Sequence, residues 1–112
     1  MTSERLQVPG CKRTFVRKLF GDNGQQVLHV EVEPGGEIPL HSHGCAASMF
    51  VLCGQARTLG HESRSVKPGD IVVKKPNEPH GFTDIRDSFS FISISADDGI
   101  VHTDNKWDIT YQ

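Results

Sequence analysis

Residues 37–49, with the sequence EIPLHSHGCAASM, contain the pattern that decides the fold of this chain. His41 and His43 stand two positions apart in a stretch with the character of a β-strand. Alternate side chains of a strand leave on the same face, so we expect both imidazoles to point in one direction. A third histidine, His80, lies in the segment PNEPHGF at residues 76–82, between turn-forming prolines and a glycine. Two local histidines and one distant histidine form a ligand arrangement that is common in metal-binding β-barrels.

The composition is typical of one small domain. The chain has 112 residues, enough to bury a core without disulfides. Its formal net charge is −2 and it has no long basic run, so we expect no nucleic-acid partner. No segment is apolar and long enough to span a bilayer or to act as a signal peptide, so we expect a cytoplasmic protein without a membrane partner. The three cysteines, Cys11, Cys45 and Cys53, follow no Cys-x-x-Cys pattern and are typical of free thiols.

Short alternating runs of polar and apolar residues, separated by turn signals, predict an all-β chain. Residues 1–12 are polar and are expected to form a flexible arm, followed by a single domain over residues 13–112. The clearest strand covers residues 26–33, and the sequence Pro-Gly-Gly at 34–36 is expected to end it. No apolar stripe of helical period occurs, so we expect little or no helix. About nine short strands at even spacing predict a sandwich or a barrel.

Two longer motifs follow each other along the chain. The first consists of Gly36, four further residues, the HSH of residues 41–43, and MFVLCG at 49–54. The second consists of PGD at 68–70, VV at 72–73, Pro76, and PHGF at 79–82. In this order and at this separation they resemble the two motifs of the cupin superfamily, and with their flanking strands they cover about residues 26–95. The resemblance implies a cupin-type double-stranded β-helix, or jelly-roll, barrel.

The resemblance also implies a set of metal ligands. The usual ligands of the family are three histidines and one glutamate, and the histidines correspond to His41, His43 and His80. The position of the glutamate falls on Ala47, with Ser48 beside it, and neither side chain can replace a carboxylate. The chain therefore resembles the three-histidine members of the superfamily, such as cysteine dioxygenase-like and diketone-cleaving enzymes.

Three neutral imidazoles leave a divalent cation with its full charge and about three open positions on an octahedral ion. Such a site favours a small anionic chelating substrate, for example an enolate, a thiolate-carboxylate or a 2-oxo acid, with dioxygen beside it. We therefore expect one divalent metal ion, iron before nickel, manganese, zinc or copper, in a dioxygenase or related oxidative enzyme. The sequence offers no convincing general acid or base, which leaves open a non-catalytic module that binds or senses a small ligand. A barrel that keeps the histidines only as hydrogen-bonding core residues is a third interpretation.

Several other residues are candidates for the lining of the pocket. Cys45 follows His43 by two positions, either as a thiolate ligand or as a small buried thiol, and Gly44 favours the second because it breaks the strand. Arg57 is either an anion clamp or an ordinary surface residue. The remaining candidates also suit an ordinary core, and they are Ala47, Met49, Val51, Phe82 and Phe91.

Apolar residues outside the motifs predict self-association. Cupins of this size commonly pair through one sheet, and the chain has enough apolar residues for such a face. These residues are Phe15, Phe20, Phe50, Leu52 and the segment 107–111. We therefore expect a homodimer that binds a small-molecule ligand or substrate.

Overall fold

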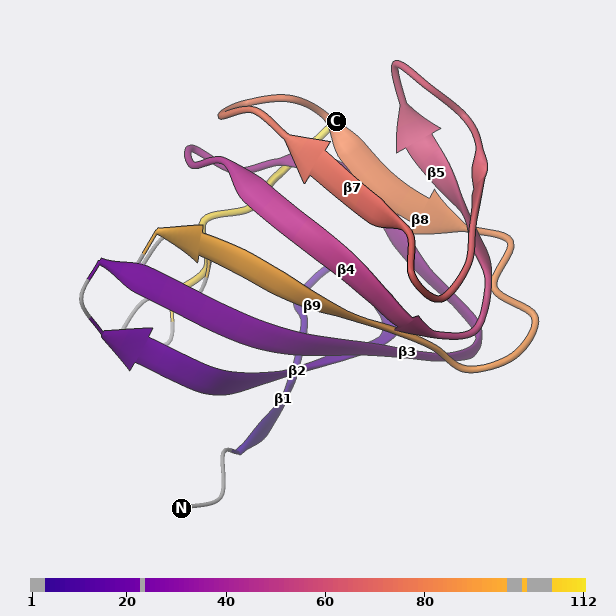
Figure 1. Cartoon of the computed structure of the whole chain (residues 1–112), viewed down its shortest axis with the longest axis horizontal. Helices are drawn as coiled ribbons and strands as arrows, with labels where there is room; N and C mark the ends of the chain where they lie inside the picture. Colours follow the sequence, from indigo (N-terminus) through magenta and orange to yellow (C-terminus); the bar gives the residue numbers. More distant parts are fainter. Residues whose placement is uncertain (1–3, 23, 97–99, 101–105) are drawn as a thin grey trace.

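The computed structural model describes residues 4–22, 24–96, 100 and 106–112, and over these residues it contains strands and turns but no helix (Figure 1). The described strands are β1 (Arg5–Gln7), β2 (Lys12–Asp22), β3 (Gln25–Ser42), β4 (Ala47–Cys53), β5 (Ala56–Gly60), β6 (Ser65–Val66), β7 (Ile71–Lys74), β8 (His80–Thr83), β9 (Phe89–Ala96) and β10 (Thr110–Tyr111). The predicted all-β jelly-roll architecture is therefore confirmed. The described part of the chain also has no helix that is long and apolar enough to cross a membrane.

The long strand β3 joins the two sheets of the barrel. Its first half pairs with β2 and β9, so that β2, β3, β9, β4 and β7 lie side by side in one curled layer (Figure 1). Its second half pairs with β8 and β10, and β8 continues through β5 to β6. All of these pairs are antiparallel, as expected when short turns connect most of the strands.

The prediction that residues 34–36 end a strand is wrong, because β3 continues through them. Gly35 adopts a φ of 81°, which glycine reaches without strain, and this lets the strand bend from one sheet into the other. The N–H of Gly35 donates to the carbonyl of Ile85 at 2.9 Å, so the backbone stays paired at the bend. A Cβ at Gly36 would lie 2.5 Å from Val32 Cγ1, which requires glycine there as well.

The core fills the space between the two sheets. It follows the period of two in each strand, and in β9 the residues from Phe89 onward alternate between buried and half-buried. Phe82 from β8 and Phe89 and Phe91 from β9 form its aromatic centre, with ring centroids 5.0 to 5.7 Å apart. Such tilted aromatic contacts add to the free energy of burying the rings.

Residues 5–8 belong to the barrel, which corrects the expectation of a loosely held arm over this stretch. β1 pairs with β2, with Leu6 opposite Val16, and Val8 is buried in the core. The guanidinium of Arg5 lies 3.6 Å from the ring centroid of Phe15. Leu6 and Val8 are spaced as in a strand, but two apolar residues among polar neighbours are a weak signal. Residues 1–3 of the expected arm lie outside the described residues.

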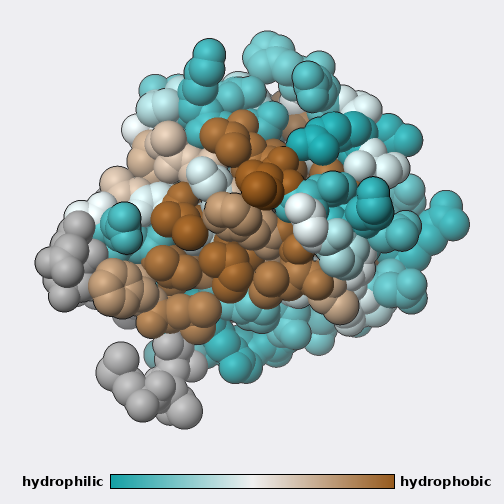
Figure 2. Space-filling view, in the orientation of Figure 1, coloured by the Kyte–Doolittle hydropathy of each residue, from teal (hydrophilic) through white to brown (hydrophobic). Residues whose placement is uncertain are grey.

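Apolar side chains also gather on the outside of the layer that contains β4, β7 and β9. We call this region the outer apolar face, and it consists of Phe50, Leu52, Ile71, Val73, Ile92 and Ile94. Figure 2 shows the apolar area across the middle of this side of the molecule. The register places Phe50 between Ile71 and Ile92, and Val73 is 66% exposed. Phe20 of the predicted pairing surface is exposed on β2, whereas Phe15 lies beneath Arg5.

Candidate metal centre

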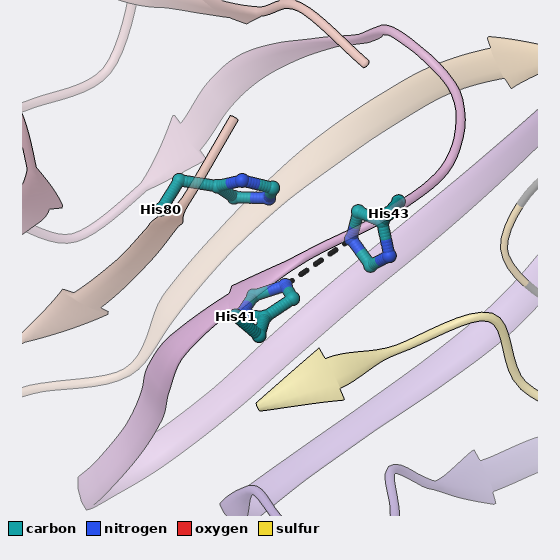
Figure 3. A group of neighbouring side chains, drawn as sticks. All are labelled: His41, His43 and His80. Atoms are coloured by element: carbon teal, nitrogen blue, oxygen red, sulfur yellow. Dashed lines mark hydrogen bonds between the residues drawn. The ribbon is translucent and has the colours of Figure 1, made fainter. Parts of the chain in front are cut away.

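Three buried histidines from two parts of the chain point toward one another inside the barrel (Figure 3). His41 lies near the end of β3 and His43 directly follows that strand, with both rings on one side as their spacing predicts, and His80 is the first residue of β8. The register of β3 and β8 places His80 opposite His41. One ligand nitrogen from each ring lies within 4.8 Å of the other two, and His41 Nε2 is 3.1 Å from His43 Nε2.

The position of His80 depends on a close approach of β8 to β3. A Cβ at Gly81 would collide with the carbonyl oxygen of Ile38, so only glycine lets the two strands come this near. On the other side, Gly60 has a φ of 125°, and a Cβ there would lie 2.6 Å from the carbonyl oxygen of Pro79. Two glycines therefore allow the strand that carries His80 to pack between its neighbours.

Each imidazole is oriented by a hydrogen bond from its Nδ1 to a backbone carbonyl. The acceptors are Pro39 for His41 at 2.7 Å, Asp108 for His43 at 2.6 Å, and Glu78 for His80 at 2.9 Å. A carbonyl oxygen can only accept, so Nδ1 must carry the proton in all three rings. A neutral ring in this tautomer has a free lone pair on Nε2, and metal-ligating histidines are held in this way.

The short distance between the Nε2 atoms of His41 and His43 fits a cation that both rings share. With both Nδ1 atoms protonated, two neutral rings would bring two lone pairs to 3.1 Å, which is unfavourable without a positive charge nearby. Two nitrogen ligands at about 2.1 Å from an ion and at right angles to each other lie about 3.0 Å apart. The residues at this site therefore fit a divalent metal ion.

Burial keeps the three rings in the neutral form that binds metals. It lowers the pKa of His41 from 6.5 to about 3, with a further contribution from the nearby His80. It lowers the pKa of His80 to about 4 and that of His43 in the same direction, and in both rings the hydrogen bond to a carbonyl opposes the shift. A metal ion therefore does not have to displace a proton from these rings near neutral pH.

We expect the metal-free protein to lose stability as the pH falls below 6.5. Unfolded histidines take up a proton near pH 6.5, whereas folded His41 and His80 stay neutral down to about pH 3 and 4. The unfolded state therefore binds more protons in this range, and acid favours unfolding. Between pH 7.5 and pH 5 the free energy of unfolding should fall by about 2 kcal/mol for each of these two rings, or about 4 kcal/mol in all, measured by urea denaturation after chelation of metals. The decrease should be smaller in His80→Gln, and an equal decrease would contradict the explanation.

A cavity of about 50 Å³ lies beside the three imidazoles and opens to the surface. Its wall comes from both sheets and from both end segments of the chain. Apart from the histidines, the described residues that line it are Val8, Cys11, Thr14, Val16, Leu28, Val30, Ile38, Ala47, Met49, Phe82, Phe91, Ser93, Ile100, Trp107 and Ile109. Within this described lining there is no aspartate, glutamate, lysine or arginine.

Four of the residues that we expected near the pocket are in this wall, namely Ala47, Met49, Phe82 and Phe91. Ala47 stands where the family has its glutamate, so the described wall presents a methyl group at this position. Val51 faces the core further along β4 and does not reach the cavity.

Arg57 and Cys45 lie away from the cavity. Arg57 is exposed, because its neighbours Ala56 and Thr58 take the inward positions of β5, and its guanidinium donates to Ser63 Oγ at 3.2 Å. Cys45 follows the end of β3 and is not among the converging ligands. Burial raises the pKa of its thiol, with the charge of Asp108 adding to the shift, so the neutral thiol is favoured. This geometry therefore does not support Arg57 as an anion clamp or Cys45 as a thiolate ligand.

Asp108 is a part of the site that the sequence did not reveal. Its backbone carbonyl accepts the hydrogen bond from His43, and its carboxylate Oδ2 accepts the N–H of Gly44 at 2.8 Å. The residue thus holds both the ring of His43 and the turn that follows it. No sequence signal could have shown the first contact, because every residue carries the same backbone carbonyl.

The segment from Trp107 to Tyr111, which we expected on a pairing surface, contributes to the wall of the cavity. Trp107 and Ile109 line the cavity, and Tyr111 in β10 pairs with His41 of β3. The ring of Tyr111 lies 5.9 Å from that of His41, and its hydroxyl contacts Cys11 Sγ at 3.2 Å. The alternation of Trp107, Ile109 and Tyr111 was a usable signal, but it does not say which surface the apolar side chains cover.

Comparisons with known proteins place this geometry in a family. The sequence pattern described as "Cupin domain" matches residues 28–94, a stretch that contains all three histidines. No curated protein matches the chain.

Solved structures share the fold over most of the chain. The polyketide cyclase RemF from Streptomyces resistomycificus is 26% identical, with a TM-score of 0.74 over 84% of this chain and 73% of that one. An uncharacterized conserved protein with a double-stranded β-helix domain from Klebsiella pneumoniae is 24% identical, with a TM-score of 0.72 over 95% and 90%. A predicted oxalate decarboxylase from Thermotoga maritima is 20% identical, with a TM-score of 0.74 over 86% and 92%. With its family pattern, its barrel and its buried histidines in agreement, this chain belongs to the cupin family.

Proposed function

We propose that this protein binds one divalent metal ion through His41, His43 and His80 and oxidises a small anionic chelating substrate with dioxygen. The observation that carries the proposal is the convergence of three neutral imidazoles, with Ala47 in place of the family's carboxylate. Such a ligand set leaves the ion its full charge and about three open positions. When bound, the metal would supply a Lewis acid and a template for substrate and oxidant.

The residues of the chain support this chemistry without acting as acids or bases. The carbonyls of Pro39, Glu78 and Asp108 keep the three rings in the ligating tautomer. The apolar wall excludes water from the substrate and strengthens the attraction between the ion and an anionic donor. Coordination to the metal ion would lower the pKa of an enol or a thiol, so its proton could pass to solvent without a basic side chain.

Iron is the metal that we propose, because the reaction needs a redox-active ion. Imidazole also accepts nickel, manganese, zinc and copper, and relative affinity follows the Irving–Williams order rather than function. The metal found after purification can therefore differ from the one that supports activity. Similarity at 26% identity to RemF, a polyketide cyclase, supports an enzymatic role.

We expect iron(II)-loaded protein to consume oxygen with at least one member of a panel of 1,3-diketones, thiol carboxylates and 2-oxo acids. An oxygen electrode measures the uptake, and mass spectrometry identifies the product. His41→Ala, which removes one ligand, should show no uptake above that of free iron. Absence of uptake with every member of the panel would contradict the proposal.

A second candidate function is a module that binds or senses a small ligand. The described wall has no aspartate, glutamate, lysine or arginine, and its three histidines are assigned to the metal, which favours this function because no other side chain there is placed to move a proton. Calorimetric titration with parallel turnover assays separates the two functions. Tight binding without product would establish the sensor, and product formation would exclude it.

We further propose that two copies of the chain pair through the outer apolar face. None of its six residues is charged, so the face can meet its own copy without repulsion, as a two-fold interface requires. The six side chains expose on the order of 400 Å² of apolar surface, which is within the range of patches that mark interaction sites. A stable interface buries ~800 Å² per partner, and a polar rim would supply the remainder.

Light scattering should therefore give about twice the 12.4 kDa mass of one chain. Leu52→Asp places a charge in the centre of the outer apolar face and should convert the dimer to a monomer. Gln55→Asp adds the same charge at an exposed position outside the face and should leave the dimer intact. A wild-type protein that remains a monomer at millimolar concentration would exclude this pairing.

A further inference from the structure

The wall of the cavity is apolar well beyond the three imidazoles. Met49 from β4, Phe91 from β9 and Phe82 from β8 contribute the interior side, and Trp107 and Ile109 contribute the side that closes over the site. Within the described lining, the side chains with polar groups other than the histidines are Cys11, Thr14, Ser93 and Trp107, the last with only its indole N–H.

Two of these polar groups are already engaged by the protein. Thr14 Oγ1 donates to the carbonyl of Lys12 at 2.9 Å, and Cys11 Sγ contacts the hydroxyl of Tyr111. The hydroxyl of Ser93 has no hydrogen-bond partner among the described residues, and it stands on the inner face of β9 opposite Met49. The described wall therefore offers a ligand one free hydroxyl and the indole N–H of Trp107, but no charged group.

We propose that the natural ligand of this site has an anionic chelating head and a compact alkyl or aryl body without charge. The head rests on the proposed function, because the metal ion supplies its counter-charge. The assignment of an uncharged body depends only on the lining of the cavity. A carboxylate, phosphate or ammonium on the body would be buried against Met49, Phe91 and Ile109 without a partner, which strongly opposes binding. An apolar body instead gains about fourfold in affinity for each methylene that it buries.

The fluorescence of Trp107 can be used to measure ligand binding in the cavity. Trp107 is the only tryptophan of the chain and it lines the cavity, so its fluorescence responds to molecules that bind there. Nickel(II)-loaded protein suits the experiment, because hydroxamates chelate nickel and no oxygen chemistry follows. The readout is then binding and not turnover.

The test compares hydroxamates that share one head and differ in the body. Butyrohydroxamate has two more methylenes than acetohydroxamate and should bind at least tenfold more tightly. Succinate monohydroxamate has the same reach but ends in a carboxylate, and it should bind more weakly than butyrohydroxamate by tenfold or more. Equal affinities across the three probes, or tighter binding of the carboxylate, would overturn the proposal.

Variants locate the effect in the cavity. Ile109→Asn makes the wall polar and should remove most of the preference for butyrohydroxamate, whereas Ile94→Asn makes the same change on the outer apolar face and should preserve it. Ser93→Ala removes the one free hydroxyl and should leave the preference unchanged or larger. A preference that survives in Ile109→Asn, or is lost in Ser93→Ala, would contradict an apolar recognition mode. Thermal denaturation of each variant confirms that the fold persists.

The metal-free protein separates this proposal from the proposed function. Toluene has no chelating head, and it should change the fluorescence of Trp107 in metal-free wild type but less in Ile109→Asn. Toluene binding supports the apolar cavity even if no hydroxamate binds, and in that case the metal function has failed. If toluene does not bind, and butyrohydroxamate binds no more tightly than acetohydroxamate, the inference about the apolar body is overturned. Binding of the hydroxamates would still show that the metal site is intact.

Discussion

Replacing His80 with alanine should remove the metal from the protein and leave the barrel folded. His80 supplies the one ligand that comes from β8, and the two remaining nitrogens come from His41 near the end of β3 and from His43 directly after it. Altering groups that merely support a ligand weakens metal binding by about 10- to 100-fold, so the loss of a ligand should exceed that range. Elemental analysis after dialysis measures the metal content, and competition with a chelator measures the affinity.

His61→Ala is the matched control for this substitution. His61 is an exposed histidine in the turn after β5 and is not part of the converging group. Its replacement should leave the metal content unchanged. Full metal occupancy in His80→Ala, with a normal circular dichroism spectrum, would show that the three rings do not share an ion.

Phe89→Ala should destabilise the protein by about 3–5 kcal/mol, which is a large fraction of the stability of a domain of this size. Phe89 is 0% exposed and packs against Phe82 and Phe91, with centroids 5.2 and 5.7 Å away. The large effect follows from the lost burial of the ring together with the void that it leaves in a packed core. Urea denaturation measures the change, preferably on metal-free protein so that binding does not contribute.

Leu52→Ala tests whether this loss reflects burial. Leu52 is 51% exposed on the outer apolar face, so its truncation in the monomer should change the free energy of unfolding by less than about 0.5 kcal/mol. Phe89 does not line the cavity, and the folded fraction of Phe89→Ala should still bind metal. A loss below about 1 kcal/mol would mean that neighbouring rings refill the space or that this cluster is not the centre of the core.

The histidine pair was predictable because it depends on local geometry. His41 and His43 share a face for the same reason as any two residues separated by two in a strand, and β3 includes the first of them. The bend at Gly35 was not predictable in this way. Pro-Gly-Gly ends many strands, and here β3 continues because the N–H of Gly35 finds the carbonyl of Ile85, which lies fifty positions further along the chain.

The sequence by itself determined which side chains could act as ligands, that two of them face the same way, and that the family's carboxylate is absent at Ala47. Only the tertiary structure decided that His80 lies opposite His41, because strand register is set by pairing between distant segments. It also decided that Trp107 and Ile109 cover the site and that the carbonyl of Asp108 orients His43. The physical reason is that every residue has the same backbone carbonyl, so the sequence does not show which carbonyl accepts a given hydrogen bond. The hydrophobic effect is also non-directional, so an apolar residue in the sequence does not show which surface it will pack against.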